Sequence, residues 1–116
     1  MSDLNENIRP WGRYDILNEE NDYKLKMILV EPEQRLSYQF HYKRDEYWII
    51  IEGKAEVTLD NETHILSKGE SITINRQRKH RVKNIGSSTL RFIEVQLGDY
   101  FGEDDIERLA DDYHRS

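Results

Sequence analysis

The feature that most constrains the fold is a series of short runs in which β-branched, aromatic and aliphatic residues alternate with polar ones. Gly, Pro, Asn and Asp residues of the kind found in turns separate these runs. We expect strands at Tyr23–Val30, Arg35–Tyr42, Glu46–Glu52, Lys54–Leu59, Thr63–Leu66, Glu70–Ile74, His80–Lys83 and Thr89–Leu97. Many short strands favour a closed or double-sheet β-barrel. We also expect a short C-terminal helix over Glu103–Tyr113, because Ile106, Leu109 and Ala110 would share one helical face.

The length of 116 residues suits one domain over residues 1–116, with residues 1–8 as a flexible N-terminal end. A formal net charge of −6 argues weakly against nucleic acid as a partner. The polar N-terminus does not resemble a signal peptide, and the apolar run Tyr47–Ile51 is too short to cross a bilayer. We therefore expect a cytoplasmic protein without a membrane partner.

Four side chains with metal-binding chemistry occur at informative spacings. Gln39 and His41 are two residues apart on an expected strand, so they leave the same face of a sheet. Glu46 opens the next strand, and His80 opens a much later one. The chain has no cysteine, so any metal site must use imidazole, carboxylate and amide groups. His64 and His114 are expected to be structural or exposed.

The first part of this pattern resembles the first sequence motif of the cupin superfamily. In that motif a Gly precedes two His ligands spaced by one residue, a Glu follows, and a Gly comes six residues later. Here Gln39 and His41 stand in the two His positions, Glu46 in the acidic position and Gly53 in the closing turn. Glu33 replaces the leading Gly. The resemblance implies a jelly-roll barrel, also called a double-stranded β-helix.

The second cupin motif leads from a Gly through a Pro-x-Gly turn to a His and then an Asn. Gly69, His80 and Asn84 match it, while Asn75 and Gln77 replace the Pro and the Gly of the turn. These departures affect turns more than ligands. The two motifs together imply a metal site made by the residues Gln39, His41, Glu46 and His80. Such a mixed nitrogen and oxygen site suits Zn²⁺ best among divalent ions, with Mn²⁺, Co²⁺ or Ni²⁺ as alternatives.

Three longer strings narrow the resemblance. RPWGRYDIL, RLSYQFHYKRDEYWIIIEGKAEV and IEVQLGDYFGEDDIERLADDY are similar to the C-terminal domain of type II phosphomannose isomerases, over about Arg9 to Tyr113. In that family the domain usually follows a GDP-mannose pyrophosphorylase domain, whose Gly-rich signature is absent here. The family commonly has His-His-His-Arg where this chain has HYKR at positions 41–44. The resemblance implies a metal-dependent aldose–ketose isomerase that interconverts mannose 6-phosphate and fructose 6-phosphate.

The reaction would need a proton carrier and a group that binds the substrate phosphate. Because Glu46 would hold the metal, the candidates for the proton carrier are Lys43, Arg44, Glu94 or a water on the metal. For the phosphate, Arg44 is the first candidate, followed by Arg35 and Arg81, because a guanidinium binds phosphate oxygens in a bidentate manner.

Two other functions stay open at this stage. Tyr42 and Lys43 replace two family histidines, which keeps a non-catalytic cupin that binds a sugar or another small ligand as an alternative. A metal-dependent oxygenase fits less well, because an amide replaces a His. A homodimer is expected, since small barrels often pair through an exposed sheet edge.

We expect Trp11 to anchor the N-terminal arm by packing, and Trp48 and Ile50 to belong to the core, because they share the strand parity of Glu46. The acidic run Glu103–Asp105 would sit at the start of the expected helix.

Overall fold

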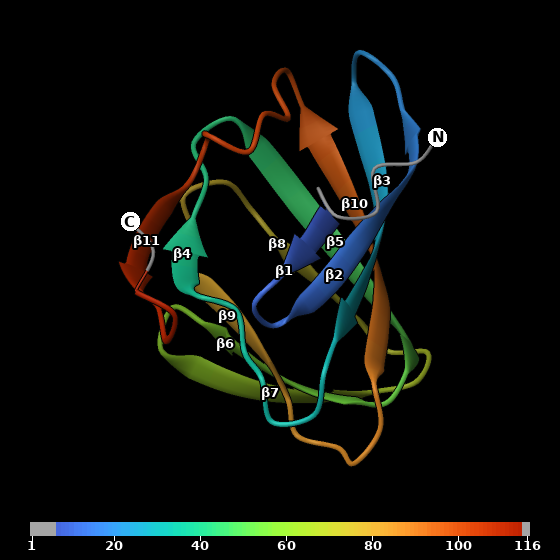
Figure 1. Ribbon diagram of the computed structural model, residues 1–116. Coiled ribbons are helices and arrows are strands. Elements are labelled where there is room, and N and C mark those ends of the chain that lie inside the picture. Colours follow the sequence, from blue (N-terminus) through green and yellow to red (C-terminus); the bar gives the residue numbers. More distant parts are fainter. Residues whose placement is uncertain (1–6, 115–116) are drawn as a thin grey trace.

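Two antiparallel β-sheets make up the fold in the computed structural model, which describes residues 7–114. The first sheet has the order β1 (Ile8–Arg9), β2 (Gly12–Glu19), β3 (Tyr23–Val30), β10 (Leu90–Gly98), β5 (Arg44–Glu52) and β8 (Ser71–Ile74). The second has the order β11 (Glu107–Ala110), β4 (Tyr38–Phe40), β9 (His80–Asn84), β6 (Lys54–Leu59) and β7 (Glu62–Ser67). Figure 1 shows the two sheets facing each other as the walls of a barrel. The all-β barrel expected from the sequence is confirmed.

The core lies between the two sheets and follows from the alternation along their strands. Every second residue of β3, β5 and β10 is buried, and β6 and β9 show the same period. Successive side chains of a strand point to opposite faces, so one set from each strand faces the opposing sheet. Phe92 and Ile50 of the first sheet and Val57 and Val82 of the second are at most 1% exposed. Their burial holds the two walls together.

The sequence located most of the strands. β3 and β6 have the expected bounds, and β5, β7, β8, β9 and β10 differ from expectation by one or two residues at one or both ends. The expected strand Arg35–Tyr42 is shorter, because only Tyr38–Phe40 forms β4 while Arg35 makes an isolated bridge to Lys83. Strands β1, β2 and β11 were not predicted.

The expected helix over Glu103–Tyr113 is wrong. Residues Glu107–Ala110 form β11, which pairs with β4, and the part of the chain that the structure describes contains no α-helix. Leu109 is 49% exposed, so the apolar residues that suggested a helical face do not form a buried face. Pairing with β4 satisfies the backbone groups of this segment instead, and Arg81 Nη2 donates to the carbonyl of Ala110 at 3.1 Å.

The acidic run Glu103–Asp105 therefore does not cap a helix. Asp105 is buried, and its carboxylate accepts the backbone N–H groups of Tyr42 and Lys43 at 3.0 Å each. Glu103 pairs with Lys26, with 2.6 Å between Oε2 and Nζ. These contacts hold the segment after β10 against β3 and against the loop between β4 and β5.

The N-terminal expectations are tested only in part. Residues 1–6 of the expected flexible end lie outside the described residues, and Ile8 pairs with Arg13 in the β1–β2 ladder. Trp11 is 5% exposed and belongs to the core, which confirms its expected role as a packing anchor. Residues 7–114 include no helical stretch with the length and apolar character that a membrane span needs.

Asn84 provides a test of the fold that does not involve the site. Its side chain is fully buried, donates to the carbonyls of Val30 and Ser88 at 2.8 Å each, and accepts the N–H of Gly86 at 2.9 Å. Asn84→Ala leaves these backbone groups without that partner, so the free energy of unfolding should fall by about 3 kcal/mol in urea denaturation. The exposed Asn75→Ala is the control, expected within about 0.5 kcal/mol of the parent chain. Equal stability of the two variants would contradict this account.

Candidate metal centre

The inner face of the first sheet changes from apolar to polar along its length. Toward the start of β3 and β5 and the end of β10, inward positions that would continue the core carry charged or amide side chains. All are at most 8% exposed: Lys24, Lys26, Arg44, Glu46, Glu94 and Gln96. Burying so many ionisable groups is unfavourable unless they are paired or used. We therefore expect the functional side chains to lie in this polar half of the barrel.

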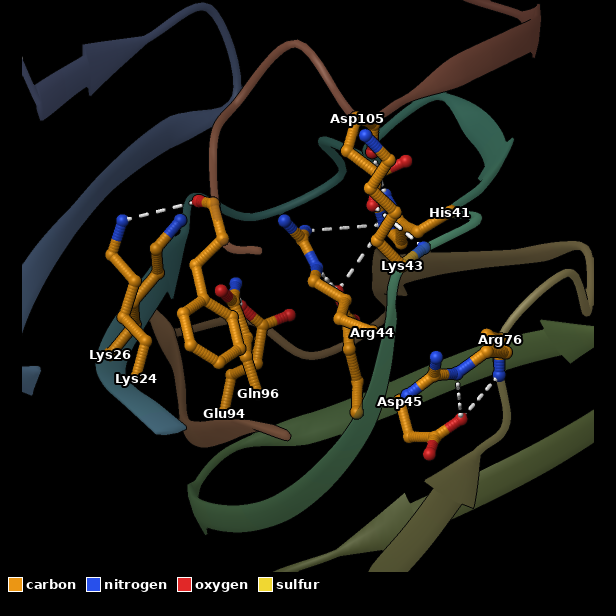
Figure 2. Close-up of polar contacts among 12 residues, drawn as sticks. Lys24, Lys26, His41, Lys43, Arg44, Asp45, Arg76, Glu94, Gln96 and Asp105 are labelled. Carbon is orange, nitrogen blue, oxygen red and sulfur yellow. Dashed lines mark hydrogen bonds and ion pairs between the residues drawn. The ribbon is translucent and has the colours of Figure 1, made fainter. Parts of the chain in front are cut away.

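The strand register arranges these side chains in two rows. Glu46 lies opposite Gln96, which lies opposite Lys24. In the next row Trp48 lies opposite Glu94, which lies opposite Lys26. Figure 2 shows Lys24 and Lys26 next to Glu94 and Gln96, with Arg44 and His41 beyond them.

Two histidines converge on the carboxylate of Glu46. His41 follows β4, Glu46 lies in β5 and His80 begins β9, so three separate segments supply the group. The Nε2 atom of His41 lies 3.2 Å from Glu46 Oε2, and that of His80 lies 3.8 Å from Glu46 Oε1. One potential ligand atom from each residue lies within 4.8 Å of the others. The convergence expected for three of the four predicted ligands is thus present in the geometry.

Second contacts fix the tautomer of both imidazoles. Nδ1 of His41 lies 2.6 Å from the carbonyl oxygen of Asp105, and Nδ1 of His80 lies 2.9 Å from that of Arg78. A carbonyl only accepts hydrogen bonds, so each Nδ1 carries a hydrogen and each Nε2 keeps its lone pair. Metal-binding histidines are commonly oriented in this way. The donor set therefore fits a divalent cation.

The protonation states also suit a cation. Burial, helped by the charge of Arg44, lowers the pKa of His41 to about 4, and burial lowers the pKa of His80 as well. Burial alone would raise the pKa of Glu46, but the charge of Arg44 outweighs it and lowers this pKa to about 2. Neutral imidazoles and an ionised carboxylate are the forms that bind metals.

Arg44 supplies the positive charge that faces this group. Its Nε donates to Glu46 Oε2 at 2.8 Å, and its Nη2 lies 3.3 Å from His41 Nε2. The side chain is 6% exposed, and its Nη1 is a buried donor without a hydrogen-bond partner among residues 7–114. A guanidinium thus contacts two of the atoms that a metal ion would use.

Gln39, the fourth expected ligand, lies on the wall of the same cavity as Glu46 and His80. It is opposite His80 in the β4–β9 ladder, and its Nε2 donates to Ser37 Oγ at 2.9 Å. This contact leaves the amide oxygen as the atom for a cation. Its coordination stays a prediction.

Only some of the predicted catalytic and substrate-binding residues line this cavity. Arg44, Glu94 and Arg81 lie on its wall. Arg35 does not, and its Nε and Nη2 atoms bind the carboxylate of Asp112 at 2.6 and 2.8 Å. Lys43 is exposed, with Nζ 4.9 Å from the ring centre of Tyr100. The structure therefore assembles some of the predicted catalytic and substrate-binding residues and not others.

Sequence reasoning missed several residues of the cavity wall. They are Arg9, Tyr14, Lys26, Glu103 and Arg108. A signal for Lys26 was present, because Lys24 and Lys26 share strand parity with Ile28 and Val30 in the run YKLKMILV. Inward lysines in line with core residues indicate a buried polar site.

Comparison with known proteins gives the family. The profile of the family described as mannose-6-phosphate isomerase C-terminal matches residues 2–111. The chain belongs to this family. The alginate biosynthesis protein AlgA of Pseudomonas aeruginosa is 46% identical over 108 residues, which cover 93% of this chain and 22% of AlgA. Mannose-1-phosphate guanylyltransferase of Salmonella montevideo is 44% identical over 108 residues, which cover 93% of this chain and 23% of that enzyme. This member of the family thus spans less than a quarter of these relatives.

Solved structures confirm the fold of this mannose-6-phosphate isomerase C-terminal family member. The cupin domain of Cnp3 from Schizosaccharomyces pombe superimposes with a TM-score of 0.71 at 20% identity, covering 75% of this chain and 64% of that one. A Klebsiella pneumoniae protein with a double-stranded β-helix domain gives a TM-score of 0.75 at 20% identity, covering 93% and 95%. The cupin barrel expected from the motifs is confirmed.

Removal of a converging ligand should strongly weaken metal binding. We expect His41→Ala and Glu46→Gln each to weaken Co²⁺ binding by at least about 100-fold in calorimetric titration, because each removes a donor atom from a group of three. His64→Ala removes an imidazole that is 43% exposed and should bind Co²⁺ as the parent chain does. Unchanged affinity in both ligand variants would exclude this centre.

The metal-free protein should lose stability as the pH falls from about 6.5 to about 4. The pKa of His41 is about 4 in the folded chain against 6.5 for an ordinary His, so between these values the unfolded chain binds more protons. This one group removes on the order of 3 kcal/mol from the free energy of unfolding over that range. Urea unfolding with a chelator should therefore show a shallower pH dependence for His41→Gln. Parallel curves for the two proteins would contradict the buried, neutral state of this imidazole.

Proposed function

We propose that this domain interconverts mannose 6-phosphate and fructose 6-phosphate, using a divalent metal ion held by His41, Glu46, His80 and Gln39. The observation that carries the proposal is the convergence of two neutral imidazoles on an ionised carboxylate, beside a second buried carboxyl group. Membership of the mannose-6-phosphate isomerase C-terminal family supports the choice of substrate. The activities named for the much longer relatives are those of the relatives.

The proposed ion would act as a Lewis acid toward the carbonyl and hydroxyl oxygens of the sugar. Zn²⁺ is our first choice, because two imidazoles and a carboxylate are a common zinc-binding set, and Mn²⁺, Co²⁺ and Ni²⁺ are the alternatives. Isomerisation moves one proton from C2 to C1 and one from the oxygen on C2 to the oxygen on C1. The protein must therefore supply a group that takes a proton from carbon and returns it.

Glu94 has the surroundings of such a proton carrier. It is 5% exposed and lies on the cavity wall, next in the sheet to Trp48, whose Nε1 donates to Glu94 Oε2 at 3.0 Å. Gln96 Nε2 donates to the other oxygen at 2.8 Å. Burial and the charge of Glu46 raise the pKa of Glu94. A carboxyl group whose pKa moves toward neutrality can both accept and donate a proton.

Arg44 is suited to the charge that develops on the substrate. Its Nη1 is buried without a partner among the described residues, and its side chain lies on the cavity wall. This donor could bind an oxygen of the enediolate that forms between the two sugars. Lys43, the third catalytic candidate, lies over Tyr100 and does not line the cavity. Glu94 and Arg44 are therefore the residues that we assign to catalysis.

The test is turnover by the metal-loaded protein. In ¹H NMR, the parent chain with Zn²⁺, Mn²⁺ or Co²⁺ should convert mannose 6-phosphate, and Glu94→Gln should lower kcat/KM by at least about 100-fold, because it removes the proton carrier. Co²⁺ affinity should not change, since Glu94 is outside the ligand group. The exposed Glu62→Gln is the matched control.

Full activity in Glu94→Gln would assign the proton to another group. Binding of mannose 6-phosphate by the parent chain without turnover would favour the alternative of a non-catalytic cupin. The homodimer and the cytoplasmic location stay predictions from the sequence.

A further inference from the structure

The outer face of the first sheet, which points away from the core, is apolar along three neighbouring strands. On β3, β10 and β5 the residues between the buried ones point outward, because successive side chains of a strand alternate between its two faces. Most of these outward side chains are aliphatic or aromatic, and we call them the outer patch: Leu25, Met27, Leu29, Tyr47, Ile49, Ile93, Val95 and Leu97. Tyr47 and Leu97 are 37% and 47% exposed, so the patch is open to water.

The strand register makes the outer patch continuous. Ile93 of β10 lies opposite Met27 of β3 on one side and Ile49 of β5 on the other. The next row, in the same order of strands, consists of Leu25, Val95 and Tyr47. Side chains that lie directly opposite on one face of a sheet are close enough to touch. The patch is therefore one surface centred on β10.

The outer face of the second sheet has a different character. Its outward positions on β6 and β9 include Glu56, Thr58 and Lys83. Both sheets bury their inner residues, so the barrel itself does not require an apolar outer face. An antiparallel sheet with one face in water normally carries polar residues on that face. A continuous apolar surface on a folded domain instead marks a site of interaction.

Ion pairs lie along the border of the outer patch. They are Arg13 with Asp15, Arg91 with Glu52 and Arg76 with Asp45, with N···O distances of 3.3, 2.7 and 3.5 Å. These pairs carry as many positive as negative charges, although the whole chain has a net charge of −6. Two copies can therefore meet at this face with less repulsion than their net charge would produce elsewhere. An apolar centre with a charged rim of both signs is complementary to a second copy of itself.

The size of this face is close to what a stable dimer needs. From β2 to β8 it is five strands wide, and strands about 4.8 Å apart with about seven residues of about 3.4 Å each give a flat area of roughly 550 Å². Projecting side chains make the accessible area larger than the flat area. Stable interfaces bury about 600 to 1,000 Å² on each partner. The outer patch and its border are thus large enough for an interface at the lower end of this range.

We propose that the outer patch is the interface of a two-fold homodimer of this chain. A two-fold axis through the centre of the patch would place Ile93 and Val95 of one copy against the same surface of the other. The homodimer expected from the sequence would then form through a sheet face and not through a sheet edge. The edge strands of the first sheet, β1 and β8, have only two and four residues and offer few backbone groups for pairing. Tyr47 and Glu46 leave opposite faces of β5, so this interface does not depend on the proposed function.

The experiment is sedimentation equilibrium of the full chain at micromolar concentrations. The parent chain should have the mass of two chains. Leu97→Glu and Ile93→Glu each place a carboxylate on the patch of both copies, and each should raise the dissociation constant of the dimer at least about 100-fold, because an unpaired charge is costly to bury. A parent chain with the mass of one chain would overturn the dimer and leave the patch to a different protein.

Ile65→Glu is the matched control. Ile65 is 50% exposed on β7 of the second sheet, so the same change at this position should leave the dimer intact. Circular dichroism and urea unfolding distinguish a dissociated chain from an unfolded one. Leu97 is 47% exposed in the single chain, so Leu97→Glu should fold even if Ile93→Glu does not. A folded Leu97→Glu variant with the dissociation constant of the parent chain would place the interface elsewhere.

Thiol labelling tests the same surface without adding a charge. The chain has no cysteine, so an introduced one is its only thiol. The thiol of Leu97→Cys should react with a maleimide several-fold more slowly at concentrations where the dimer forms than at high dilution. The thiol of Ile65→Cys, at a position of nearly equal exposure, should react at the same rate under both conditions. Protection of Ile65→Cys, or equal rates for Leu97→Cys, would contradict the proposed interface.

Discussion

The carboxylate of Glu46 is ionised at a position that is 2% exposed, and the rest of the site depends on how that charge is balanced. A buried carboxylate without partners would be neutralised by a proton. Here Arg44 Nε donates to Glu46 Oε2 at 2.8 Å and Trp48 Nε1 donates to Glu46 Oε1 at 3.1 Å, and these two donors offset the negative charge. The result is a preformed negative centre with neutral nitrogen donors around it.

The segment after β10 orients this centre, and it is where sequence reasoning was weakest. The backbone carbonyl of Asp105 binds His41 Nδ1, and its carboxylate binds the N–H groups of Tyr42 and Lys43. The pairing of β11 with β4 holds Asp105 in this place. A helix over the same residues would have given these groups intrahelical partners. The strand that replaced the expected helix is therefore part of what sets the tautomer of a metal-ligand candidate.

What the sequence could predict was local in character. The alternation of apolar and polar residues located β3 and β6, and spacing on the chain found His41, Glu46 and His80. What it could not supply were partners far along the chain, such as Asp112, which lies 77 residues from Arg35 and occupies its guanidinium. Lys26 was missed for another reason. A lysine in a strand is usually expected to face the solvent, and only its alternation in step with the core residues Ile28 and Val30 indicates that it faces inward.

The charges of the cavity link the proposed metal ion and the proposed proton carrier. A divalent ion held by Glu46 would add two positive charges beside Arg44, within a space that already holds Lys26 and Arg9. Coulomb attraction would then favour ionised Glu94, whose raised pKa in the metal-free chain keeps it protonated more readily. Burial and the charge of Glu46 raise the pKa of Glu94 and the proposed ion would lower it, so the two effects together would favour a carboxyl group that can both take up and release a proton.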